Sequence, residues 1–189
     1  MKNFYFLFLL ILFYSCSEDG TSIPEEKPEE NNFSSEIFFS EYVEGTSYNK
    51  ALEIVNLTGE NINLETKIYS IKKQSNRTGD WMGEVLLEGD LAHEETFVIG
   101  NESAPISKII SGSNQLKAGT SLDFNGNDPV GLFKNGELID IIGYLDTVED
   151  FAKDQTLRRK KSITEPSLEY NPDDWEFLEM DNVEDLGSY

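Results

Sequence analysis

From residue 33 onward, short runs of aromatic and β-branched residues alternate with frequent turn signals. Several short strands separated by turns are typical of β-sandwiches and β-barrels. No long segment has a helical period, and only residues 146–153 favour a short helical turn. We therefore expect an all-β domain. Its first five predicted strands are residues 37–43, 51–57, 67–72, 84–88 and 96–99.

Asn135-Gly136 lies between two strand-like runs and is the strongest hairpin signal in the chain. This dipeptide favours a two-residue type I′ turn, because Asn and Gly tolerate the positive φ that both positions need. Such a loop pairs residue 134 with 137, then 133 with 138, 132 with 139, 131 with 140 and 130 with 141. Residues paired in this way share a face of the sheet. The face that we expect in the core consists of Val130, Leu132, Ile139 and Ile141.

The first 16 residues combine a basic start at Lys2, an apolar run over residues 4–14 and a small residue before a cysteine. This arrangement is typical of a secretory signal peptide, which we place at residues 1–15. The apolar run is shorter than the roughly 20 residues that span a bilayer. Ser15-Cys16 resembles the lipobox of bacterial lipoproteins, in which the cysteine becomes the lipidated N-terminus.

Glu18-Asp19, directly after Cys16, are similar to the acidic surface-export signal of lipoproteins of the Bacteroidetes. This resemblance implies an exported outer-membrane lipoprotein that is held to the membrane by its lipid and exposed at the cell surface. The alternative is a cleaved, soluble secreted protein in which the cysteine is incidental. More than one lipid chain is needed for stable anchoring, so Cys16 would have to be multiply acylated.

Residues 16–32 are expected to form a disordered acidic linker. Pro24, Pro28 and several glutamates leave Ile23 as the only large apolar residue of this segment. Such a composition cannot bury enough surface to fold, and charge repulsion keeps it extended. Residues 33–189 have a length typical of one domain. Because Cys16 is the only cysteine, this domain must hold without an intramolecular disulfide.

The formal net charge of −21 argues against a nucleic-acid partner. Proteins bind nucleic acids chiefly by neutralising phosphates with Lys and Arg. The one basic cluster, residues 158–161, lies within an acidic chain. We expect this cluster to pair with carboxylates of the domain itself.

Several stretches of the domain carry a resemblance that extends over residues 35–189. They are residues 37–45, 49–56, 91–92, 97–101, 121–128, 130–143, 153–160 and 175–189. Together they resemble bacterial lamin-tail domains. The resemblance implies an immunoglobulin-like β-sandwich. Such domains occur alone on lipoproteins or attached to secreted nucleases, phosphatases and other hydrolases, and they share no known catalytic activity.

Residues 123–128 place oxygen-bearing side chains around Gly126. Calcium prefers six to eight oxygen ligands, and a loop of this kind supplies several of them. The pattern is not an EF-hand, because no bidentate Glu follows at the required place. A tight turn without metal needs the same residue types, so both interpretations stay open. The candidate calcium ligands are Asp123, Asn125, Asn127 and Asp128.

Two carboxylates lie in predicted strands. Glu41 shares the predicted face of Ile37, Phe39 and Val43, and Glu53 lies between two apolar residues of the next strand. Carboxylates on neighbouring strands can act as an acid and a base. A buried carboxylate otherwise requires a cationic partner. The residues that we expect in structural ion pairs are Glu41, Glu53, Lys50, Arg158 and Arg159.

Nucleophilic or zinc-dependent catalysis has little support in the sequence. His93 is the only histidine, and it lies in a predicted surface turn. A Ser-His-Asp triad needs a histidine that a carboxylate holds within reach of a serine. A zinc site prefers several His or Cys ligands, and with one histidine and Cys16 assigned to lipid the chain has few of them. We therefore expect a non-catalytic module that interacts with a protein, a glycan or cell-envelope material. The alternative is an accessory subunit of a secreted nuclease or phosphatase, or a metal-assisted hydrolase.

Overall fold

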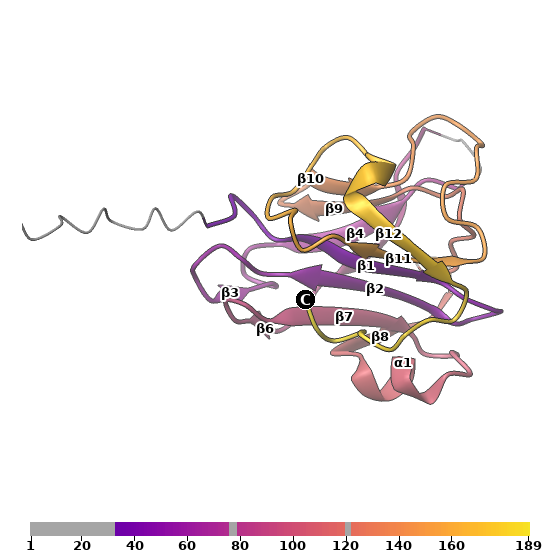
Figure 1. Ribbon diagram of the computed structural model, residues 1–189. Coiled ribbons are helices and arrows are strands. Elements are labelled where there is room, and N and C mark those ends of the chain that lie inside the picture. Colours follow the sequence, from indigo (N-terminus) through magenta and orange to yellow (C-terminus); the bar gives the residue numbers. More distant parts are fainter. Residues whose placement is uncertain (1–32, 76–78, 120–121) are drawn as a thin grey trace, which may run out of the picture. The chain divides into compact units, whose positions relative to one another are not determined.

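The computed structural model describes residues 33–75, 79–119 and 122–189 (Figure 1). The predicted signal peptide, the predicted lipidation site Cys16 and the predicted linker lie outside the described residues. The described chain is mostly β-sheet, as the sequence predicts. Neither of its helices has the length and apolar character needed to cross a membrane. The strands are β1 (Phe38–Glu44), β2 (Lys50–Val55), β3 (Ile62–Asn63), β4 (Tyr69–Lys73), β5 (Met82–Leu86), β6 (Asp90–Leu91), β7 (Thr96–Asn101), β8 (Gln115–Lys117), β9 (Val130–Lys134), β10 (Glu137–Ile142), β11 (Gln155–Arg159) and β12 (Trp175–Glu179).

These described strands form two larger sheets and one small sheet. The first is six-stranded with the order β12-β11-β1-β2-β7-β8, and the second is four-stranded with the order β10-β9-β4-β5. Strands β3 and β6 pair separately. Every described pair is antiparallel except β7 with β8. Short strands with turns thus produce the all-β content that the sequence predicts, and the five predicted runs correspond to β1, β2, β4, β5 and β7.

Side chains from both larger sheets meet in one apolar cluster. Tyr42 of β1 and Leu52 of β2 reach it from the six-stranded sheet, and Ile71 of β4 and Leu132 of β9 reach it from the four-stranded sheet. Side chains alternate between the two faces of a strand, so the intervening residues face the other side. Burial of each large apolar side chain contributes about 1.5–3 kcal/mol.

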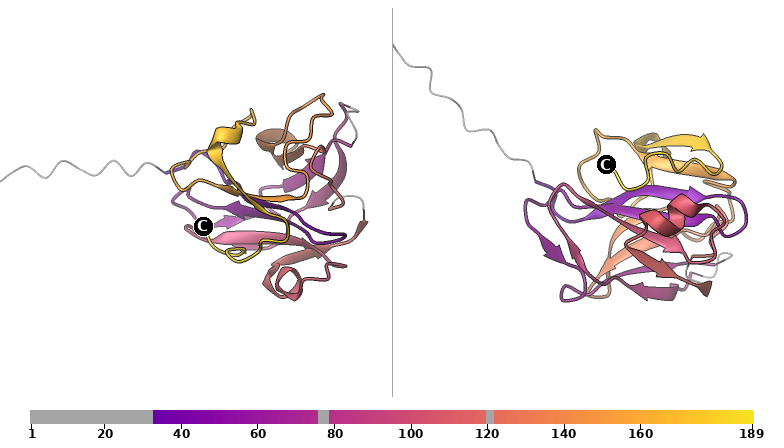
Figure 2. Two further views of the ribbon diagram at one scale, coloured as in Figure 1. Left: turned by 45° about the vertical axis from the view of Figure 1, so that its right-hand side comes forward. Right: turned by 90° about the horizontal axis from the view of Figure 1, so that it is seen from below.

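The opposite face of the six-stranded sheet is also covered. Helix α1 (Ser107–Gly112) and the segment after β12 pack there around Val43, Ala51 and Val98. In Figures 1 and 2, α1 lies next to β7 and β8, and the C-terminal segment ends beside the sheet. The hydroxyl of Tyr189 lies 2.7 Å from the carbonyl oxygen of Ile163 and 3.0 Å from that of Lys160, and its single proton is shared between these two acceptors. The chain end is therefore fixed to the domain.

The predicted type I′ hairpin forms between β9 and β10. Asn135 and Gly136 have φ values of 51° and 84°, and residues 134 and 133 pair with 137 and 138 as predicted. Beyond that point the predicted register is wrong, because a β-bulge at Ile139 shifts the pairing by one residue. Asp140 then lies opposite Leu132, on the face that points to the core. Ile142 takes a core position, and Ile139 packs against the core only partly buried.

A second bulge, in β1, changes the predicted position of Glu41. The register with β2 shifts between Phe39 and Glu41. Phe39 and Tyr42 both point into the main core, whereas Val43 lies on the outer face. Glu41 pairs with Glu53 between these positions and lies on the outer face with Val43. The prediction that Glu41 shares one face with Ile37, Phe39 and Val43 is therefore wrong for Ile37 and Phe39 and right for Val43.

The helical prediction for residues 146–153 is also wrong, because this segment contains no helix. Helix α1 was not predicted. It begins two residues after Pro105, a residue that is common near helix starts, and it buries Ile109. A one-turn 3-10 helix, η2 (Pro172–Asp174), precedes β12 and is capped by the side chain of Asn171. These elements are too short for a helical period to reveal them.

Candidate functional site

Asp140 and Arg159 form a buried ion pair that joins three strands. Their side chains are 0% and 2% exposed, and Arg159 Nη1 lies 2.7 Å from Asp140 Oδ2. The backbone N–H of Phe39 donates to Oδ2 at 2.8 Å, and that of Ser167 donates to Oδ1 at 2.7 Å. Burial raises the pKa of Asp140 to about 6 although Arg159 opposes the shift. Arg159 therefore pairs with a carboxylate that was not among the predicted residues.

Glu41 and Glu53 lie directly opposite each other on β1 and β2, and each residue is only 1% exposed. Glu41 Oε2 lies 3.2 Å from Arg158 Nε, and Arg158 Nη1 lies 2.8 Å from Asp185 Oδ2. Burial, together with the charge of Glu53, raises the pKa of Glu41 to about 7. Two buried carboxylates thus face each other, and one of them, Glu41, pairs with an arginine.

Glu53 makes its hydrogen bonds to groups other than the predicted cations. Ser40 Oγ donates to its Oε1 at 2.7 Å, and the backbone N–H of Gly187 donates to its Oε2 at 2.6 Å. Burial raises the pKa of Glu53. Lys50 pairs with Glu44 at 2.5 Å. Glu53 therefore bonds directly to the C-terminal segment, and Glu41 is linked to it through Arg158, which pairs with Asp185.

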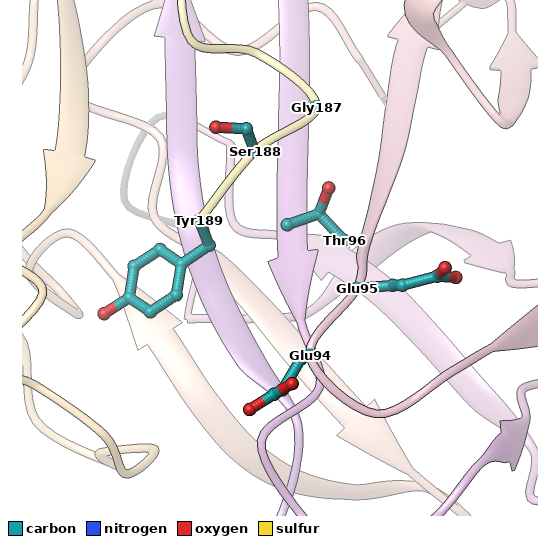
Figure 3. A pocket seen from close by; sticks show the side chains of 6 residues that line it. All are labelled: Glu94, Glu95, Thr96, Gly187, Ser188 and Tyr189. Atoms are coloured by element: carbon teal, nitrogen blue, oxygen red, sulfur yellow. The ribbon is translucent and has the colours of Figure 1, made fainter.

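A recess of about 340 Å³ lies where the C-terminal segment meets the start of β7. Its lining residues are Glu94, Glu95, Thr96, Gly187, Ser188 and Tyr189. Figure 3 shows the side chains of Glu94 and Glu95 pointing in different directions. Because its two carboxylates diverge, this recess does not present a converging set of ligands to a cation.

Two of the four predicted calcium residues, Asp123 and Asp128, contact a lysine. Lys73 Nζ contacts Asp123 Oδ1 and lies 3.7 Å from Asp128 Oδ2, so an ammonium group already lies between the two carboxylates. Asn125 is exposed and Asn127 is half-buried. Within the described ranges, no cluster of three or more His, Cys, Asp or Glu residues is arranged to hold a metal ion. A calcium ion at this position would have to displace the ammonium group of Lys73.

The position of Gly126, in the middle of this loop, requires a glycine for structural reasons. Its φ is +79°, and a Cβ atom there would lie 2.4 Å from the backbone of Lys153. Its N–H donates to the hydroxyl of Tyr42 at 3.2 Å. The glycine-containing pattern is therefore needed for close packing of the backbone, whether or not a metal binds.

His93 also has a structural role. Its Nδ1 accepts a hydrogen bond from the backbone N–H of Gly59 at 3.1 Å, and the ring of Phe33 packs edge-on against its ring at 5.4 Å. Trp175 lies in the main core, where its ring is 5.2 Å from the guanidinium of Arg159. These contacts hold the fold together and leave neither ring as an open ligand platform.

One site was missed by the sequence interpretation. Glu36, directly before β1, accepts hydrogen bonds from the hydroxyl of Tyr69 and from Lys134 Nζ. These residues border a recess of about 240 Å³ between the loops that follow β2 and β3. The only local signal was Lys134 at the hairpin turn, and nothing in the sequence shows that residues 36, 69 and 134 come together.

Comparison with known proteins does not assign the chain to a family. No protein-family model matches the chain, and no curated protein is significantly similar to it. The resemblance to lamin-tail domains therefore remains an inference from the sequence motifs.

Proposed function

We propose that this protein is a lipid-anchored, surface-exposed binding module without catalytic activity of its own. The observation that carries the proposal is the use of its buried ionisable groups. Asp140, Glu41 and Glu53 bind arginine or backbone N–H groups that join strands and loops. Groups held in this way stabilise a scaffold, and binding is left to the recesses at its surface.

The anchor and the fold family belong to the same proposal. The apolar run before Cys16 and the acidic residues after it support export, lipidation and surface exposure. Two sheets that share one apolar core are compatible with the proposed immunoglobulin-like sandwich of lamin-tail type. The net charge of −21 supports a ligand other than a nucleic acid.

The anchor is tested by metabolic labelling with a palmitate analogue in cells that express the full chain. Wild-type protein incorporates the label, partitions with the outer membrane and is cleaved by protease added to intact cells. The Cys16→Ser variant incorporates none. Equal labelling of both proteins contradicts lipidation at Cys16, and protection of labelled wild-type protein from protease contradicts surface exposure.

The facing pair Glu41 and Glu53 is the specific observation that favours the alternative, a metal-assisted hydrolase or its accessory subunit. A carboxyl group whose pKa is raised to about 7 by burial suits a general acid at neutral pH. Phosphatase and nuclease assays of the full chain, with and without Mg²⁺ or Ca²⁺, test this role. We expect no turnover, and turnover that the Glu41→Gln variant loses while it stays folded would overturn the non-catalytic proposal.

A further inference from the structure

The missed recess lies at the point where the described chain begins. Its volume is about 240 Å³, below the roughly 300–1,000 Å³ of pockets for drug-sized ligands, which suits one ring-sized group. Four chain segments contribute to its wall, which carries charged, polar and apolar side chains. The residues that line it are Ser34, Ser35, Glu36, Thr58, Glu60, Ile62, Lys67, Tyr69 and Lys134.

One wall of the recess is held rigid by its own hydrogen bonds. Glu36 binds both the hydroxyl of Tyr69 and Lys134 Nζ, and this ammonium lies 5.5 Å from the centroid of the Tyr69 ring. Ser35 is held from the other side, where its N–H donates to Glu165 Oε2 at 2.8 Å. Groups fixed in this way lose little conformational entropy when a ligand binds.

Two further charges of the recess are not engaged. The side chains of Glu60 and Lys67 are exposed, and neither has a hydrogen-bond or ion-pair partner in the described part of the chain. Glu60 is an acceptor and Lys67 is a donor. With Glu36 paired to Lys134, the recess has no net charge, although the chain carries −21.

Phe33 adds an apolar surface next to the recess. Its side chain is 49% exposed, and its ring rests on Gly59, where a Cβ atom would lie 2.9 Å from it. Gly59 lies between two residues that line the recess, Thr58 and Glu60. An exposed ring that is supported from beneath can pack against a flat apolar face of a ligand.

We propose that this recess binds a neutral sugar residue of a glycan. A sugar has adjacent hydroxyl groups, one of which can accept from the ammonium of Lys67 while its neighbour donates to the carboxylate of Glu60. The C–H face of the same sugar ring then packs on Phe33. An anionic ligand would instead be repelled by the acidic chain. This inference rests on the proposed binding function and adds its ligand class and its location.

The test uses the full-length chain in detergent micelles and titration calorimetry against defined oligosaccharides. Neutral hexose oligomers are compared with uronic-acid oligomers of the same length and with a peptide of mixed sequence. The double variant Glu60→Gln/Lys67→Met removes the two free charges of the recess with little change in side-chain volume. Phe33→Ser removes the neighbouring ring. Thermal melting verifies that each variant is folded.

The chain offers a matched control at the opposite end of the six-stranded sheet. The N–H of Glu102 donates to the carbonyl of Lys117 at 3.1 Å, so the two residues are neighbours, and their side chains have no ion pair within the described residues. Glu102→Gln/Lys117→Met removes the same two charges there. We expect at least tenfold weaker binding of a neutral oligosaccharide by the recess variants and less than twofold change in the control.

The remaining outcomes separate this inference from the proposed function. Binding of neutral sugars that the recess variants retain, or that only the control variant loses, overturns the location. Binding of uronic-acid oligomers or the peptide in preference to neutral sugars overturns the ligand class, and binding of none of the three overturns the inference as a whole. Turnover of an oligosaccharide by wild-type protein overturns the non-catalytic function itself.

Discussion

Arg158 and Arg159 are consecutive residues of β11, and each pairs with a buried carboxylate on an opposite face of the same strand. The carboxylate of Asp140, beside Arg159, uses both of its oxygens in bonds to an arginine or a backbone N–H. The carboxylate of Glu41, beside Arg158, has one buried oxygen without a partner in the described chain, and it faces a second carboxylate. Two ion pairs that look equivalent in the sequence therefore differ in how well their charges are compensated.

This difference indicates which ion pair stabilises the fold through bonds between strands and which one depends on a neighbouring segment of the chain. A buried charge is costly unless its partner and its remaining hydrogen bonds are all in place. The carboxylate of Asp140 meets this condition and joins β1, β10 and β11, although Nε of its partner Arg159 is buried without a hydrogen-bond partner among the described residues. The Glu41 pair meets it incompletely and depends on the C-terminal segment, which supplies Asp185 to Arg158 and the N–H of Gly187 to Glu53.

The largest effect is expected from Arg159→Met. This change leaves Asp140 buried without its cation, which costs about 3–5 kcal/mol of unfolding free energy at pH 7. Urea denaturation followed by circular dichroism measures the loss. The double variant Arg159→Met/Asp140→Asn also removes the unpaired buried charge and should recover a large part of the lost unfolding free energy. A single variant within about 1 kcal/mol of wild type would show that the pair is not structurally important.

The next effect is a fall in stability as the pH rises from 5 to 8. The pKa of Glu41 is raised to about 7, mainly by burial and also by the charge of Glu53. The stabilising contribution of Glu41 is therefore present below the pKa that this group has in the unfolded chain, and it is lost as the pH rises through 7. A pKa that differs by one between the folded and unfolded chains corresponds to about 1.4 kcal/mol, so the expected loss of unfolding free energy is on the order of 2 kcal/mol.

Glu41→Gln should flatten this dependence, because the neutral side chain no longer has to ionise in the interior. The pKa values of Glu53 and Asp140 are also raised, so the unfolding free energy of this variant should still fall with rising pH, but less steeply. Denaturation curves at pH 5, 6, 7 and 8 for both proteins measure the difference. Parallel curves would mean that Glu41 does not titrate in this range.

A smaller effect is expected from Asp185→Asn. The side chain of Asp185 is more than half exposed where it meets Arg158, and exposed ion pairs contribute about 0–1 kcal/mol. The unfolding free energy should fall by less than about 1 kcal/mol, and the loss should shrink further at high salt. A loss as large as that of Arg159→Met would show that the Glu41 pair is as tightly coupled as the Asp140 pair.

The smallest effect is expected from calcium. Lys73 already supplies a positive charge to Asp123 and Asp128, so adding Ca²⁺ to chelated protein should leave the melting temperature unchanged. The variant Lys73→Gln removes that ammonium and serves as the comparison. A calcium-dependent rise in the melting temperature of wild-type protein would establish the metal site that the loop sequence also permits.

Local features of the fold could be predicted from the sequence, and features that depend on distant residues could not. The strand runs and the Asn135-Gly136 turn follow from neighbouring residues, and both are confirmed. The bulges before Glu41 and at Ile139 have no local signature, because each inserts one residue to bring a side chain to a distant partner. In the second case that partner is Arg159, which Asp140 meets on β11.

The residues of the candidate sites also divide into those that the sequence predicts and those that depend on distant contacts. Glu41 and Arg158 were foreseen as ion-pairing residues, and the structure brings these two together. Asp140, Asp185 and Gly187 were not foreseen, because each acts through a contact across the sheets or from the chain end. The recess beside Glu36 likewise arises from four separate segments, and no short motif indicates it.

The attachment of the C-terminal segment has a practical consequence for anyone who labels this protein. A tag fused after Tyr189 would follow a residue whose hydroxyl lies against two backbone carbonyls, and only two residues would separate it from Gly187, whose N–H bonds to Glu53. Residues 148–150 are exposed and lie in no helix or strand. An epitope inserted there should report surface display while leaving the sheet and both arginine pairs intact.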